Sequence, residues 1–385
     1  MFFFLWISCL VPKIITPTKI HEVRFRPAVD SQEPILQYVP NATWDHGLSS
    51  AVEQLLLEVQ TPESSLDHQA IRIALSRVGF PGQARFAKIL NGGDFPQELI
   101  NQILNDVGSE RVDVALRSRS YGNGSTLWLV GWSPHLIELD PIPRDVALDS
   151  SFSIRMKAKK EQKAVLFIAP PDGEVESGPL LSEASRSVPN MHIPGEYRYE
   201  VIVQSPQGAQ VAALFSVFSD AEPERIPALR TRIAQAVNPN EAEQVLYKAV
   251  NDIRVERGLR PLQRFVPFEA LAREHSAFMA SAGVVAHNLP NITKGVKYHA
   301  GSLFHPYAEH HESIAAAKDA QEALDVVVSS PAHLKTFLCR ECTHLSIGAT
   351  IEPVLDRVPR LFVTWEMLNF PQGEPLRKDR FTKDE

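Results

Sequence analysis

The chain has 385 residues, of which 44% are hydrophobic and 22% charged, a composition typical of a globular protein and not of a disordered one. This length predicts two or three domains rather than a single core. The formal net charge is −7, and no run of Lys or Arg could follow a phosphate backbone. A nucleic-acid partner is therefore not expected.

The N-terminus begins with a short apolar run from Phe2 to Val11. It is too short for a transmembrane helix, which needs roughly 20 residues, and it resembles the core of a signal peptide. We predict a signal-like segment over residues 1–20, with a buried N-terminal strand as the alternative. Ile7-Ser8-Cys9 also resembles a lipoprotein processing site, and a lipid on Cys9 would attach the protein to a membrane.

Residues 25–136 are predicted to form a helical layer on a β-hairpin. Apolar residues recur at helical spacing from residue 48 to 104. The pattern then changes to strand-like alternation over 112–116, a turn at 121–124 and a buried strand at 127–130. No cluster of His, Cys, Asp or Glu stands out here, so a scaffold or partner-binding role is favoured over catalysis.

Residues 137–220 show short β runs bounded by Pro and Gly, including 164–169 and 195–203. In the second run alternate apolar residues share one face, and 211–218 is the expected hairpin partner. This pattern predicts a small antiparallel β-sandwich. Such a domain usually spaces or presents its neighbours.

A Pro-rich connection leads to a third domain over residues 230–372, and a polar tail follows at 373–385. Helical spacing and stop signals predict three helices, at 238–258, 267–282 and 320–328. Two strands are predicted, at 345–351 and 361–368. A long stretch at 289–311 shows no periodicity and is predicted to be irregular. Together the three domains predict an α+β multidomain protein.

Two imidazoles and a carboxylate recur at segment junctions of the third domain. His287 follows the second predicted helix, Glu312 follows the irregular stretch, and His333 follows the third helix. Side chains at such junctions can converge from distant parts of the chain. They could ligate a divalent metal with positions left open for water, or form a hydrogen-bonded pocket that supports the fold. The residues leave both readings open.

Other histidines lie close by in the sequence. His299, His305, His310 and His311 crowd the stretch before Glu312, where a metal site is one interpretation and solvated side chains are the other. His275 lies on the apolar stripe of its predicted helix. It is interpreted as a core histidine rather than a ligand. No serine lies in a recognisable nucleophile setting.

Cys339 and Cys342 are the only cysteines after Cys9. Their spacing is compatible with zinc binding together with His333 and His344, with free thiols, or with a short disulfide. In an exported protein we favour the disulfide, which would pin the turn before the strand at 345–351.

Six short motifs follow one another in the third domain: Asn251-x2-Arg254-x3-Gly258-Leu259-x-Pro261-Leu262, Ala272-x2-His275-Ser276-x2-Met279-Ala280, His287, Glu312-Ser313-Ile314-Ala315, Ser330-Pro331-Ala332-His333 and Ile347-Gly348. Their order and spacing resemble the CAP superfamily, also called the SCP or cysteine-rich secretory, antigen 5 and pathogenesis-related class 1 family, in its short bacterial form. The resemblance covers residues 238–370.

The resemblance implies an α-β-α sandwich with an open cavity lined by two histidines and acidic residues, in a protein that is usually exported. By position, His287 and His333 would be the cavity histidines and Glu312 the acid of the family's Glu-Asn motif. Glu366 stands where bacterial members often have Gln, and would return a carboxylate to the cavity. The chain departs from the family pattern at Ser313, where Asn is usual, and at Leu334, where Arg is common.

We therefore expect an exported bacterial protein, secreted or held at the cell envelope, whose cavity binds a lipid, a peptide or a glycan. No cofactor is required for that role, and the reading leans against an enzyme. The alternative is a metal-dependent hydrolase acting on peptide or cell-wall material, with a divalent metal such as zinc on His287 and His333.

Overall fold

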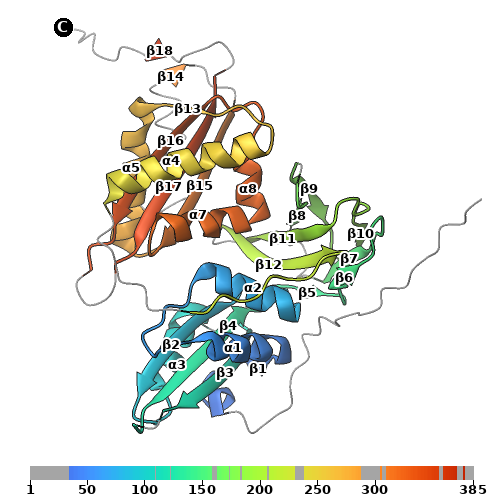
Figure 1. The fold of residues 1–385 in the computed structure, drawn as a ribbon, viewed down its shortest axis with the longest axis vertical. Coiled ribbons are helices and arrows are strands. Elements are labelled where there is room, and N and C mark those ends of the chain that lie inside the picture. The colour runs from blue at the N-terminus through green and yellow to red at the C-terminus, as the bar shows by residue number, and fades with distance from the viewer. Residues whose placement is uncertain are drawn as a thin grey trace, which may run out of the picture.

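The computed structural model describes residues 34–385 except 109, 122, 158–162, 173, 183, 206–207, 230–237, 288–303, 306–308, 355–358, 371–375 and 378–385. The predicted signal-like segment at 1–20, Cys9 and His299 lie outside these residues, as does most of the tail predicted at 373–385. The described chain is an α+β protein with several separate sheets (Figure 1). None of its described helices is long and apolar enough to cross a membrane.

The first region is a four-stranded sheet covered by helices. Its strands, in sheet order, are β1 (Ala42–Trp44), β3 (Val112–Ser120), β4 (Thr126–Pro134) and β2 (Arg85–Asn91). The helical segments are η1 (Pro34–Gln37), α1 (His46–Glu58), α2 (His68–Val78) and α3 (Gln97–Val107). The predicted hairpin corresponds to β3 and β4, whereas β1 and β2 were not predicted. Asp45 caps α1 by accepting a 2.7 Å hydrogen bond from the backbone N of Leu48.

The second region contains two small sheets that share one core, as a β-sandwich does. The larger sheet has the order β6 (Asp145–Val146), β12 (Gly208–Ser219), β11 (Gly195–Ser205), β8 (Ala164–Ala169) and β9 (Glu176–Leu180). The smaller has the order β10 (Ser185–Ser187), β7 (Ser153–Lys157) and β5 (Glu138–Leu139). Ile154 from the smaller sheet and Tyr199 from the larger belong to the same buried cluster. The Tyr199 ring stacks on Phe215, with ring centroids 5.2 Å apart.

The third region is a four-stranded sheet between helices. The strands, in sheet order, are β13 (Gln263–Arg264), β16 (His344–Ile351), β17 (Leu361–Asn369) and β15 (Glu309–Ala317). The helices are α4 (Pro239–Glu256), α5 (Val266–Ala282), α7 (Ala320–Ser329) and α8 (Pro331–Phe337). Two further short strands, β14 (Phe304–His305) and β18 (Leu376–Arg377), pair with each other.

The two faces of this sheet contact different helices. Val363 and Trp365 of β17 share a buried cluster with α4, α7 and α8, whereas Phe362 contacts Met279 of α5. Since successive strand residues point to opposite faces, α5 covers one face and α4 and α7 cover the other. Figure 1 shows α4 and α7 crossing in front of the strands. The result is the expected α-β-α arrangement.

Gly348 brings the backbone of α5 into direct contact with β16. A Cβ atom built at Gly348 would lie 2.0 Å from the backbone N of Arg273 and 2.1 Å from the carbonyl carbon of Ala272. Only glycine allows this approach. Ser276 secures it by donating a 2.9 Å hydrogen bond to the carbonyl O of Gly348. These contacts fix the face of α5 that carries His275.

The structure corrects the prediction for residues 289–311. Strand β15 begins at Glu309, so Glu312 lies within a strand rather than at the end of an irregular stretch. Helix α8, which carries His333, was also not predicted. The domain boundaries predicted at 136/137 and near 220–230 stay predictions.

Candidate functional site

Glu312 lies between two histidines from different segments. Its Oε1 is 2.6 Å from Nδ1 of His287, in the segment after α5, and its Oε2 is 3.1 Å from Nδ1 of His275 on α5 itself. The helix ends at Gly283, whose φ of 68° is the left-handed conformation that glycine favours. The chain then turns back along the sheet, which places His287 against β15.

The electrostatics of Glu312 keep it ionised. Burial by itself raises the pKa of this carboxyl group, but His275 and His287 together lower it to about 2. At neutral pH Glu312 is therefore an anion beside two imidazole rings. Its side chain is 11% exposed, whereas that of His287 is 48% exposed, so His287 is the part of the pair that solvent reaches.

Glu366 lies on the same face of the sheet as Glu312. The two residues occupy directly paired positions on β17 and β15, and paired residues of antiparallel strands point to the same side. The Glu366 side chain is fully buried and is hydrogen bonded through Oε2 to Nε2 of His310. The ring of His310 in turn stands edge-on to Phe268, with centroids 6.0 Å apart.

His333 lies on α8, on the other side of His287 from the sheet pair. The ring centroids of His333 and His287 are 6.4 Å apart. Burial, and then the charge of His287, lower the pKa of His333 to about 4, so its ring is neutral at pH 7. Nδ1 of His333 is buried and makes no hydrogen bond within the described part of the chain.

The structure thus places His287, Glu312 and His333 in succession and puts Glu366 beside Glu312. Residues 288–303, which follow His287, lie outside the described chain. The cavity expected there, and the binding role of these side chains, stay predictions.

Sequence reasoning overlooked two contributors. His275 was interpreted as a core histidine, yet its ring faces Glu312. His310 was grouped with loop histidines, although it bonds to the buried Glu366. The alternation His310-x-Glu312 was the available signal, because residues two apart on a strand share a face.

Cys339 and Cys342 are joined by a disulfide, with their Cα atoms 5.5 Å apart. A disulfide sulfur offers no thiolate to zinc. Of the histidines considered with them, His344 instead contacts Thr343 Oγ1 at 2.8 Å and stands edge-on to Phe370. His311 is the histidine that lies near both sulfurs.

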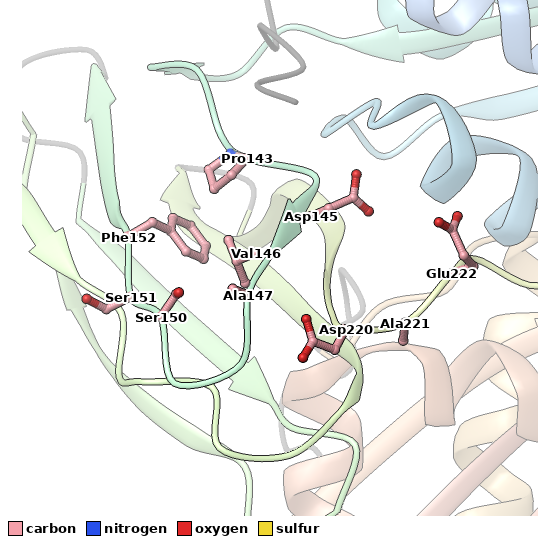
Figure 2. A pocket seen from close by; sticks show the side chains of 10 residues that line it. All are labelled: Pro143, Asp145, Val146, Ala147, Ser150, Ser151, Phe152, Asp220, Ala221 and Glu222. Carbon is pink, nitrogen blue, oxygen red and sulfur yellow. The ribbon is translucent and has the colours of Figure 1, made fainter. Parts of the chain in front are cut away.

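A separate pocket of about 460 Å³ lies in the second region, between β6 and the segment that follows β12. Figure 2 shows that its walls combine the aromatic ring of Phe152 with the carboxylates of Asp145, Asp220 and Glu222. The sequence did not point to these residues, and none of them belongs to the histidine and glutamate cluster.

Comparison with known proteins gives a family for the third region. The model of the Cysteine-rich secretory protein family (CAP) matches residues 247–358. This segment includes His275, His287, Glu312 and His333, and it ends before Glu366. No curated protein shows a significant match to the chain.

Three solved structures illustrate the similar chains. An outer surface protein from Borrelia burgdorferi is 15% identical, with 36% of this chain and 98% of that one covered and a TM-score of 0.30. An extracellular protein containing a SCP domain from Bacillus anthracis is 14% identical, with 70% and 92% covered and a TM-score of 0.29. A cysteine-rich secretory protein from Staphylococcus aureus is 11% identical, with 70% and 92% covered and a TM-score of 0.27.

Proposed function

Because the C-terminal region of this chain is a CAP domain, we propose that the protein binds a ligand outside the cytoplasm, at the cell envelope or in the extracellular space. The ligand is a lipid, a peptide or a glycan, held at the site around His287, Glu312 and His333. The first two regions act as a scaffold that carries the CAP domain.

The observation that supports binding is the polarity of the Glu312 pair and its access to solvent. Glu312 is an ionised acceptor, and His287 is half-exposed next to it. Together they offer a carboxylate oxygen and an imidazole nitrogen to amide or hydroxyl groups of a ligand. A preformed pair of this kind costs little ordering when a ligand binds.

Binding can be tested with the full chain and three sets of probes: phospholipid vesicles, peptide libraries and soluble peptidoglycan fragments. We expect one set to bind in calorimetry, and Glu312→Gln to weaken that binding at least tenfold while thermal unfolding stays cooperative. Glu176→Gln, which changes an exposed glutamate on β9, is the control and should bind normally. Binding that is equal in both variants, or absent for all three sets, would contradict the proposal.

A second candidate is a metal-dependent hydrolase that acts on peptide or cell-wall material. The supporting observation is His333, whose neutral ring keeps a buried Nδ1 without a hydrogen bond in the described chain and lies 6.4 Å from His287 between ring centroids. These two rings fit a zinc ion, which would supply a bound water of lowered pKa. Hydrolysis of peptidoglycan fragments that chelation removes and added zinc restores would establish this candidate in place of simple binding.

A further inference from the structure

We propose that His275, Glu312 and Glu366 form a second cation site, which binds one divalent transition metal such as Zn²⁺ or Mn²⁺ between α5 and the sheet. This site is distinct from a zinc ion on His287 and His333, with which it shares no ligand. It does not depend on the ligand-binding role proposed above.

The spacing of the candidate ligand atoms suits one metal ion. One nitrogen or oxygen from each of His275, Glu312 and Glu366 lies within 4.8 Å of the others, and Nδ1 of His275 is 3.1 Å from Oε2 of Glu312. Neighbouring ligands of a tetrahedral zinc ion lie about 3.3 Å apart when its bonds are about 2.0–2.1 Å long. The three side chains therefore need little movement to enclose a cation.

The orientation of His275 is that of a metal ligand. Its Nε2 is 3.2 Å from the carbonyl O of Ala286. A carbonyl oxygen only accepts, so Nε2 carries a proton. Its Nδ1 is buried, faces Glu312 and makes no hydrogen bond in the described chain. Metal-binding histidines typically donate their other ring N–H to a carbonyl in this way, which directs the lone pair of the ligating nitrogen at the metal.

The two carboxylates need a compensating positive charge. The Glu312 side chain is 11% exposed and that of Glu366 is fully buried. Like charges at directly paired strand positions repel, and buried anions are normally paired or bound to metals. A divalent cation between them would neutralise both and would also face the lone pair of His275.

The outer contacts also match a metal site. His287 holds Oε1 of Glu312, and His310 holds Oε2 of Glu366. Each carboxylate is therefore oriented by an imidazole that is not itself a ligand, as outer-shell partners orient metal ligands. One nitrogen and two oxygens favour zinc or manganese, whereas Mg²⁺ and Ca²⁺ prefer oxygen alone.

The test uses the full chain, freed of metal by dialysis against chelator and kept oxidised so that Cys339 and Cys342 stay bonded. Zn²⁺ and Mn²⁺ are titrated by calorimetry, and zinc ligation is read by X-ray absorption. We expect one equivalent to bind, with one imidazole and oxygen ligands around the zinc. His275→Ala and Glu366→Gln should each weaken binding at least tenfold, whereas His333→Ala should leave it unchanged.

The opposite pattern would overturn the proposal. Loss of binding in His333→Ala but not in His275→Ala would assign the metal to the other pair of histidines, and two imidazoles in the absorption spectrum would do the same. Absence of binding by the wild-type chain would mean that His275 is protonated at both nitrogens and paired with Glu312 as an ion. If His275→Ala does not fold, the wild-type spectrum and Glu366→Gln still decide between these outcomes.

Discussion

The carboxylate of Glu200 accepts a 2.8 Å hydrogen bond from the hydroxyl of Ser330. Glu200 belongs to β11 of the second region and is 1% exposed, whereas Ser330 is the residue that begins α8 in the CAP domain. The same carboxylate oxygen also accepts from the backbone N of Ala332 at 2.8 Å. Residues of the sandwich therefore fix the start of the helix that carries His333.

We expect Glu200→Ala to destabilise the protein by about 2–4 kcal/mol, since it leaves two buried donors without their charged acceptor. Urea unfolding measures this loss. A double-mutant cycle with Ser330→Ala should give a coupling energy of about 1 kcal/mol or more. Strictly additive effects would show that the contact contributes nothing to stability.

Asp45 should make stability depend on pH. Burial, as the main cause, raises the pKa of this helix-capping carboxyl group from 3.8 to about 6. Between these values the native state holds more protons than the unfolded state, so its stability falls as pH rises from about 4 to about 6. Asp45→Asn keeps a good cap and removes the titration.

The difference in unfolding free energy between Asp45→Asn and wild type should therefore grow in favour of the variant by up to about 3 kcal/mol from pH 4 to pH 7. Urea unfolding of both proteins across this range is the measurement. Asp67→Asn changes the corresponding cap of α2 and serves to subtract the effect of the amide. A constant difference at every pH would contradict the assignment.

Gly348→Ala should disrupt the contact between α5 and β16. The new methyl group would meet backbone atoms of Ala272 and Arg273, which cannot rotate away. The helix must shift as a unit, so we expect a cost of about 3 kcal/mol or more in thermal or urea unfolding. Gly92→Ala is the control, because nothing lies within 4 Å of the methyl group there. Similar stability of the two variants would contradict the close approach.

Arg254 is a buried arginine, 1% exposed, that donates hydrogen bonds to the carbonyl oxygens of Arg260, Phe337 and Cys339. Arg254→Met should lower the unfolding free energy by about 3 kcal/mol, because hydrogen bonds from a charged group are the stronger ones. Lys248→Met alters an exposed position on the same helix and should change stability by less than about 0.5 kcal/mol. An equal effect of both changes would assign Arg254 no special role.

The disulfide between Cys339 and Cys342 closes a very short loop, with a sequence separation of 3. The chain-entropy model then gives less than the roughly 3 kcal/mol of a 15-residue loop. We expect replacement of both cysteines by serine to cost less than this amount. Mass spectrometry after alkylation of the unreduced protein should show both cysteines protected, and labelling of both would rule the bond out.

Regular elements with uniform patterns could be predicted from the sequence. The apolar stripe of α4 and the β runs of β8, β16 and β17 had boundaries close to those observed. Strand β15 was missed because it begins with polar and charged residues, including His310, His311 and Glu312. Functional clusters break the apolar patterns that identify strands, so the site concealed the element that holds it.

The roles of His275 and Glu200 could not be predicted for a different reason. Each depends on a partner far away in the sequence, Glu312 for His275 and Ser330 for Glu200. Helical spacing placed His275 correctly on the buried face of α5, but spacing within one helix does not say which strand it meets. The burial of Glu200 depends on how two regions dock.

The cap from Glu200 limits how freely the CAP domain can be exchanged between proteins. If the domain were cut out at residue 230 and fused to another partner, α8 would begin with Ser330 and Ala332 lacking their acceptor, and the carbonyl O of Val328 would lose the 2.6 Å bond from Arg198. A graft of this domain would have to bring β11 with it, or supply a substitute carboxylate at the same place.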